Sequence, residues 1–237
     1  MKEFREGLRS GIPICLGYLA VSFAFGIQAT EAALTPLQAA VMSLTNVTSA
    51  GQFASLDIIA RQGTLLELAF VQFIINLRYM LMSTALTQKM SSRVTTVQRM
   101  KIAYGVTDEI FGVSVLRKGG VEPAFSYGII LISVLGWVTG TTLGAVAGQV
   151  LPMRLISALG VAIYGMFVAI IIPETRKSRA VMMVVLAAFA MSTVFTYAPV
   201  LSGISSGFRI IIITITIAAA AAYLAPVPSG EAEGGAA

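Results

Sequence analysis

The sequence predicts an all-α, polytopic integral membrane protein, and three observations support this fold class. The chain has 237 residues, of which 57% are hydrophobic and only 11% are charged, whereas roughly a quarter of the residues in soluble domains are charged. Its mean hydropathy is +0.86. Several uncharged stretches reach the length of about 20 residues that a helix needs to cross the hydrocarbon core. The alternating ten-residue pattern of membrane β-barrels is missing, so we expect helices to span the bilayer.

About six segments are expected to cross the bilayer completely. They are residues 11–30, 65–86, 126–150, 155–173, 180–200 and 210–225. We expect a single transmembrane permease domain over residues 1–225. Its possible halves are 1–88 and 102–225, joined by an amphipathic cytoplasmic linker at 89–101. The Pro-, Gly-, Ala- and Glu-rich residues 226–237 are expected to form a disordered tail.

Glycine recurs at every fourth position within the third of these spans. The residues are Gly136, Gly140, Gly144 and Gly148. Small residues on one face of a helix let a second backbone approach closely. The spacing therefore predicts a tight helix–helix contact along this face.

The Lys and Arg distribution predicts two broken or re-entrant segments in addition to the full spans. Basic residues near the ends of spans are retained on the cytoplasmic side. If 34–60 crossed fully, the basic residues at 2–9 and at 89–118 would lie on opposite faces. The conflict disappears if 34–60 enters and leaves by one face and if 102–116, only about 22 Å long as a helix, does likewise from the cytoplasm. Both termini are then cytoplasmic. The alternative is an ordinary helix at 34–60 whose Ser and Thr hydroxyls bond to its own carbonyls.

Polar residues concentrate in the first of these segments, and they are the candidates for substrate binding. Residues 42–53 are rich in hydroxyl and amide side chains. Broken-helix ends at this place would offer dipoles and backbone amides to the carboxylate and ammonium groups of an amino acid. An amide inside the 65–86 span is a further candidate. The predicted binding residues are Ser43, Asn46, Ser49, Gly51, Gln52 and Asn76.

Arg78, Asp108 and Glu109 are the candidates for coupling or gating. Arg78 lies inside a predicted span, where a charge costs about 2.5–3.5 kcal/mol on insertion scales. We expect it to pair with one of the two acids, while the other takes up and releases a proton because burial raises a carboxylate pKa. Two alternatives stay open. In the first, Arg78 forms a purely structural pair near the membrane surface. In the second, the acids lie solvated in a cytoplasmic loop.

Composition and motifs exclude several other classes of protein. The single Cys15 and the lack of histidine leave no conventional zinc or catalytic cluster. No nucleotide-binding loop or hydrolase elbow is present. The basic residues are scattered at the ends of spans, which does not indicate nucleic-acid binding. We therefore expect a gradient-driven transporter without cofactor or metal, and not an enzyme. A channel or a non-transporting membrane assembly subunit for another small solute is the alternative.

Several motifs in the first half of the chain resemble one family, the AzlC-type large permease subunits of bacterial branched-chain amino acid exporters. The motifs are Gly7-Leu-Arg-Ser-Gly-Ile-Pro13, Phe23-Ala-Phe-Gly26, Met42-Ser43, Ala50-Gly51-Gln52-Phe53, Asn76-Leu77-Arg78-Tyr79 and Thr107-Asp108-Glu109. The resemblance implies export of valine, leucine and isoleucine, and also of methionine, across the bacterial cytoplasmic membrane. It also implies a partner, a small four-helix membrane subunit of the AzlD type.

Overall fold

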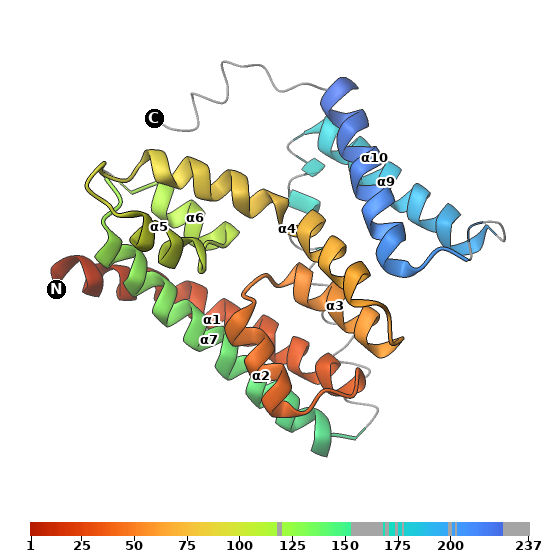
Figure 1. Ribbon diagram of the computed structural model, residues 1–237, viewed down its shortest axis with the longest axis horizontal. Helices are drawn as coiled ribbons and strands as arrows, with labels where there is room; N and C mark the ends of the chain where they lie inside the picture. Colours follow the sequence, from red (N-terminus) through yellow and green to blue (C-terminus); the bar gives the residue numbers. More distant parts are fainter. Residues whose placement is uncertain are drawn as a thin grey trace.

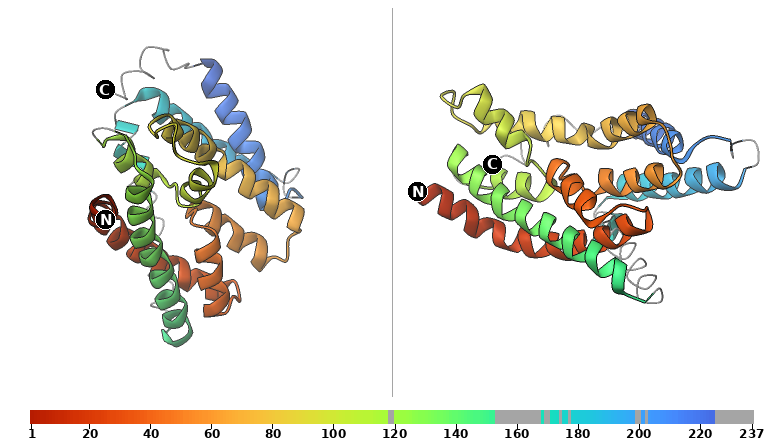
Figure 2. Two further views of the ribbon diagram at one scale, coloured as in Figure 1. Left: turned by 60° about the vertical axis from the view of Figure 1, so that its left-hand side comes forward. Right: turned by 60° about the horizontal axis from the view of Figure 1, so that its bottom comes forward.

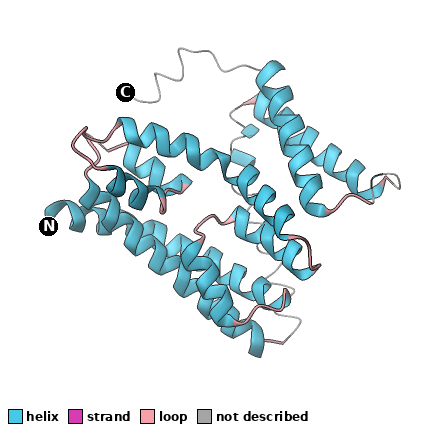
Figure 3. Cartoon of the chain, in the orientation of Figure 1, coloured by secondary structure: helices cyan, strands magenta, loops and turns pink. Residues whose placement is uncertain are grey.

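The computed structural model describes residues 1–117, 120–152, 178–198 and 203–224, with positions 168, 171–173, 175, 176 and 201 between them. These residues form helices and loops and contain no strand (Figure 3). The all-α fold class is therefore confirmed. Five of the helices are long and apolar enough to cross a membrane. The sixth expected span, 155–173, lies mostly outside the described residues, and the tail 226–237 lies wholly outside them.

The helices fall into a long and a short class, labelled in Figure 1. The long helices are α1 (Lys2–Glu31), α4 (Leu65–Gln88), α7 (Pro123–Val150), α9 (Arg179–Tyr197) and α10 (Ser206–Leu224). The short helices are α2 (Pro36–Thr45), α3 (Ala50–Ala60), α5 (Thr96–Ala103) and α6 (Asp108–Val115). Because 8 to 11 residues rise only about 12–17 Å, none of the short helices can cross a bilayer alone.

Helices α1 and α7 pack against each other along their whole length and run in the same direction (Figures 1 and 2). A methyl group added to Gly136 would lie 2.7 Å from Cys15 Sγ, and one added to Gly144 would lie 2.7 Å from the carbonyl carbon of Phe23. The residue numbers of the contacting positions thus increase together along both helices, as they do in a parallel pair. The predicted glycine face is confirmed as the surface on which the α1 backbone rests.

Helices α2 and α3 form the first hairpin, which starts beside the end of α1. Thr35 and Gln38 form a capping box that starts α2, because each side chain satisfies a backbone amide of the other. After a break at residues 46–49, α3 turns back, and Leu56 joins a buried cluster with Ala29 of α1. The segment 34–60 is therefore two half-helices that enter and leave at one end of α1, rather than one crossing helix.

Helices α5 and α6 form the second hairpin, which enters from the opposite end of the molecule. A second capping box, Thr95 with Gln98, starts α5, so this helix takes up the last part of the stretch expected as a linker. The second partial segment, expected at 102–116, is divided by a break at residues 104–107. Thr107 then caps α6 by accepting a hydrogen bond of 3.4 Å from the Ile110 amide.

The core lies between the α1–α7 pair and the two hairpins. Its largest fully buried side chains include Trp137, Phe25, Phe125 and Ile129. Helices α9 and α10 pack on each other, and α10 also packs on α4 (Figure 1). Most of their apolar side chains are exposed, as expected of helices that face lipid.

Candidate functional site

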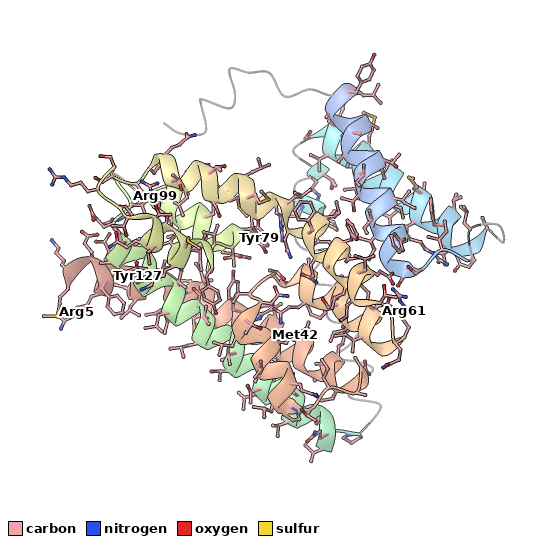
Figure 4. All side chains as sticks on the ribbon, in the orientation of Figure 1. Arg5, Met42, Arg61, Tyr79, Arg99 and Tyr127 are labelled. Atoms are coloured by element: carbon pink, nitrogen blue, oxygen red, sulfur yellow. The ribbon has the colours of Figure 1, made fainter. Side chains whose placement is uncertain are left out.

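The breaks of the two hairpins lie next to each other at the centre of the molecule. The Tyr104 hydroxyl, at the break of the second hairpin, donates a hydrogen bond to the carbonyl of Leu44, at the end of α2. From α4, the Tyr79 hydroxyl lies 3.4 Å from the carbonyl of Thr48 and donates to it. Figure 4 shows Tyr79 pointing from α4 into this region. We call the meeting point of residues 46–49 and 104–107 the hairpin junction.

A buried polar network fixes the first hairpin to α7. The Gln52 side-chain amide donates to Ser43 Oγ over 3.0 Å, and Ser43 Oγ lies 2.7 Å from Thr141 Oγ1. The Trp137 indole donates to Gln52 Oε1 over 2.8 Å. Ser43, Gln52 and Thr141 are all fully buried. A network satisfied in this way holds its helices in one arrangement, because any unpaired member would carry a desolvation penalty.

Two amides of α4 approach the start of α3 from its other side. The Gln72 side-chain nitrogen donates to the Gly51 carbonyl over 2.6 Å and to Ser55 Oγ over 2.5 Å. The Asn76 side-chain nitrogen donates to Gln72 Oε1 over 2.9 Å. A methyl group on Gly51 would lie 2.6 Å from Gln72 Oε1, so a larger residue at this position would force the Gln72 side chain to shift. Among the described residues, Asn76 Oδ1 is buried and has no hydrogen-bond donor.

The break before α3 has an unusual backbone conformation. Ser49, the N-cap, has φ 46° and ψ −89°, and its side chain makes no capping hydrogen bond. Asn46 Oδ1 accepts a hydrogen bond of 2.8 Å from the Thr48 hydroxyl. The first amides of α3 are therefore not capped by the Ser49 side chain, and helix N-termini of this kind attract anionic groups.

The charged candidates gather at the start of α6. Arg78 Nη1 lies 2.7 Å from Asp108 Oδ2, so these two residues form an ion pair. The Tyr18 hydroxyl donates to Glu109 Oε2 over 2.5 Å and lies 2.6 Å from Thr107 Oγ1. Both acids occupy the first turn of α6, where the helix dipole stabilises negative charge. Both lie just after the break in the segment that was expected at 102–116.

Burial and charge act in opposite directions on Asp108, which lies outside the five long helices. Burial raises the pKa of its carboxyl group, and the guanidinium of Arg78 opposes this rise. The negative charge of Glu109 raises the pKa further. The net result is a pKa above the ordinary value for aspartate, which brings protonation closer to neutral pH.

Sequence reasoning missed the residues of α1, α4 and α7 that complete the site, among them Tyr18, Gln72, Trp137 and Thr141. One signal was available in α7. Trp137 and Thr141 are four residues apart, and Ser133 precedes Trp137 by four, so these polar groups share one helix face. That face meets the hairpins.

Comparisons with known proteins identify the family of the chain. The family model described as AzlC protein matches residues 13–151, which include most of α1, both hairpins and α4, and α7 through its end. The chain belongs to the AzlC family. No solved structure matches the chain.

Three relatives show the range of similarity. An uncharacterized membrane protein of Archaeoglobus fulgidus is 33% identical over 73% of this chain and 76% of its own. Inner membrane protein YgaZ of Escherichia coli is 27% identical over 86% of this chain and 87% of its own. The branched-chain amino acid transport protein AzlC of Bacillus subtilis is 21% identical over 74% of this chain and 69% of its own. This AzlC-family chain is thus a multi-pass membrane protein related to a transport protein.

Proposed function

We propose that this AzlC-family protein is a secondary transporter that exports branched-chain amino acids across the bacterial cytoplasmic membrane. Its substrates in this proposal are valine, leucine, isoleucine and methionine, and its partner is a small four-helix membrane subunit of the AzlD type. The hairpin junction carries the proposal, because half-helices from opposite ends of the molecule meet there. Broken helices that meet inside the membrane are typical substrate sites of secondary transporters. The name of the Bacillus subtilis relative supports the substrate class.

The junction offers complementary groups to an amino acid zwitterion. The substrate carboxylate would bind at the start of α3, where Ser49 leaves the first amides without a side-chain cap. The ammonium group would donate to Asn76 Oδ1, a buried acceptor that lacks a donor among the described residues. The break residues Val47 and Val106 are buried apolar neighbours for the branched side chain.

The Arg78–Asp108 pair supplies a means of coupling to a proton gradient. Protonation of Asp108 removes its negative charge, and the ion pair with Arg78 at 2.7 Å is then lost. The released Arg78 side chain is free to move away from α6. Glu109 is held separately by Tyr18, so the two adjacent acids have distinct environments and roles.

The decisive experiment is transport of radiolabelled leucine into proteoliposomes that contain the purified protein with its small subunit. We expect leucine to accumulate above its equilibrium level when a pH gradient is imposed, and Asp108→Asn to abolish this accumulation. Equilibration without accumulation, whatever the gradient, would indicate a channel instead. A lack of any leucine movement in the wild type would contradict the proposal.

A further inference from the structure

Helices α1, α2 and α3 correspond in order to α4, α5 and α6. Each set begins with a long helix and continues with a hairpin of two half-helices, and each hairpin has a four-residue break, at 46–49 and at 104–107. The capping boxes Thr35–Gln38 and Thr95–Gln98 start the first half-helix of each hairpin. The same capping motif thus occurs at the start of the first half-helix in both hairpins.

The two sets point in opposite directions. The start of α4 lies beside the exit of the first hairpin, where Glu67 bonds to Arg61. The residue after its end, Lys89, accepts a hydrogen bond of 3.0 Å at its carbonyl from the amide of Val121, just before α7. Because α7 starts beside the start of α1, α4 runs against α1 (Figures 1 and 2). The chain therefore contains an inverted repeat, an arrangement that recurs in secondary transporters.

An arginine follows each hairpin and binds a glutamate of the other repeat. Arg61, directly after α3, forms an ion pair with Glu67 in the first turn of α4. Arg117, two residues after α6, pairs with Glu3 in the first turn of α1 over 2.5 Å. Each repeat thus supplies the arginine of one pair and the glutamate of the other, and the two pairs lie at opposite ends of the molecule. Figure 4 shows Arg61 at its end, beside α3 and α4.

Further contacts hold each ion pair in place. Glu67 is only 3% exposed and also accepts a hydrogen bond from the hydroxyl of Ser205, the residue just before α10. The Arg117 side chain is 16% exposed, lies 3.2 Å from Glu6 Oε1 and stacks over the Phe125 ring with its guanidinium carbon 4.5 Å from the ring centroid. Glu67 and Arg117 are thus the shielded members, whereas the side chains of Arg61, Glu3 and Glu6 are 30%, 38% and 46% exposed. Breaking either pair leaves the shielded member as an unpaired, largely buried charge, which is unfavourable.

We propose that these two pairs are reciprocal latches, Arg61–Glu67 at one face of the membrane and Arg117–Glu3/Glu6 at the other, and that releasing either one opens the hairpin junction to that face alone. Both latches are closed in this structure. The proposal rests on the proposed transport function, because it assigns the two gates that a carrier must open in turn.

Accessibility of one cysteine from each face tests the latches. Val47→Cys places a thiol in the hairpin junction, where Val47 is 6% exposed, and Cys15→Ser removes the only native thiol. A charged, membrane-impermeant methanethiosulfonate reagent is applied to right-side-out and to inside-out vesicles that hold the full chain. We expect Glu67→Gln to raise the modification rate from the Arg61 face by about tenfold, the change that follows the loss of about 1.4 kcal/mol. Glu3→Gln with Glu6→Gln should do so from the opposite face.

Matched controls use the exposed acids Glu31, at the end of α1, and Glu122, just before α7. Glu31→Gln and Glu122→Gln should leave both rates unchanged. If Glu67→Gln fails to fold, Arg61→Gln with Glu67→Gln removes the latch without leaving an unpaired charge and should open the same face. Unchanged rates in both latch variants, or a rise at the same face in both, would overturn the proposal.

The measurement needs no substrate and no transport. If opening is face-specific but leucine is not transported, the latch proposal stands and the proposed function is wrong. If leucine accumulates but opening is not face-specific, the proposed function stands and the latch proposal is wrong.

Discussion

The Trp137 indole nitrogen lies 2.8 Å from Gln52 Oε1, and this hydrogen bond joins the middle of α7 to the first turn of α3. Gln52 is fully buried and Trp137 is 1% exposed. Trp137 is also the only tryptophan in the chain. Its fluorescence therefore reports on the environment of the hairpin junction without any added label.

Gln52→Ala should destabilise the protein. The change removes the partner of the Trp137 indole and leaves a buried donor unpaired, at a cost of about 1–3 kcal/mol. We expect a lower midpoint of thermal unfolding in detergent and altered Trp137 emission. Gln88→Ala is the control, because Gln88 is exposed at the end of α4. Equal midpoints for the two variants would show that the buried network contributes nothing to stability.

Gly144→Ala should loosen the contact between α1 and α7. The added methyl group would lie 2.7 Å from the carbonyl carbon of Phe23, and backbone cannot yield cheaply. Forced overpacking of this kind costs about 1–3 kcal/mol. Gly17→Ala, on the same helix pair but with no atom within 4 Å of the new methyl group, should be neutral or stabilising. Thermal unfolding of the two variants separates these effects, and a Gly144→Ala protein as stable as the wild type would refute the tight packing.

Ser49→Gly should stabilise the protein by relieving backbone strain before α3. No capping hydrogen bond is lost in this variant, because the Ser49 side chain makes none. With φ 46° and ψ −89°, Ser49 occupies a region that costs a non-glycine residue about 1–3 kcal/mol. Ser49→Ala retains this strain, and because the side chain makes no capping bond, it should leave the midpoint of unfolding unchanged. If Ser49→Gly unfolds at a lower temperature than Ser49→Ala, the backbone conformation is not strained.

The pH dependence of leucine exchange should follow the charges around Asp108. The ion pair with Arg78 exists above the pKa of Asp108 and is lost as the pH falls through it. Arg78 lowers this pKa and Glu109 raises it. Arg78→Gln should therefore shift the acidic limb of the rate profile to higher pH, and Glu109→Gln should shift it to lower pH. Asp108→Asn should abolish the limb. Initial rates in proteoliposomes with equal pH on both sides measure these shifts, and shifts of the same sign would exclude Asp108 as the titrating group.

The local signals in the sequence were sufficient to predict the membrane fold and the broken segment at 34–60. A run of polar residues cannot face lipid, and the Lys and Arg distribution required a segment that did not cross. The break at 104–107 was also readable, because Thr107 followed by two acids is a strong helix start. A broken or re-entrant segment was expected over 102–116, but the position of its break was not predicted.

The partners of the site residues were not predictable in the same way. Tyr18 meets Glu109, and Trp137 meets Gln52, only because α1 and α7 pack in one particular register. That register is set by backbone contact at glycines distant in the sequence. The pairing of Arg78 with one of the two acids was expected, but the choice of Asp108 depends on where α6 begins.

The parallel packing of α1 and α7 limits how many times the chain can cross the membrane between these two helices. Two neighbouring helices that point the same way must be separated by an odd number of net crossings, and among the described residues between α1 and α7 only α4 is long enough to provide one. The two hairpins must then each contribute zero. We therefore expect the N-terminus, the connection at 89–95 and the described residues of the connection before α7 to lie on one face, together with most of the basic residues of the first half of the chain. Charge retention predicts that this face is the cytoplasmic one.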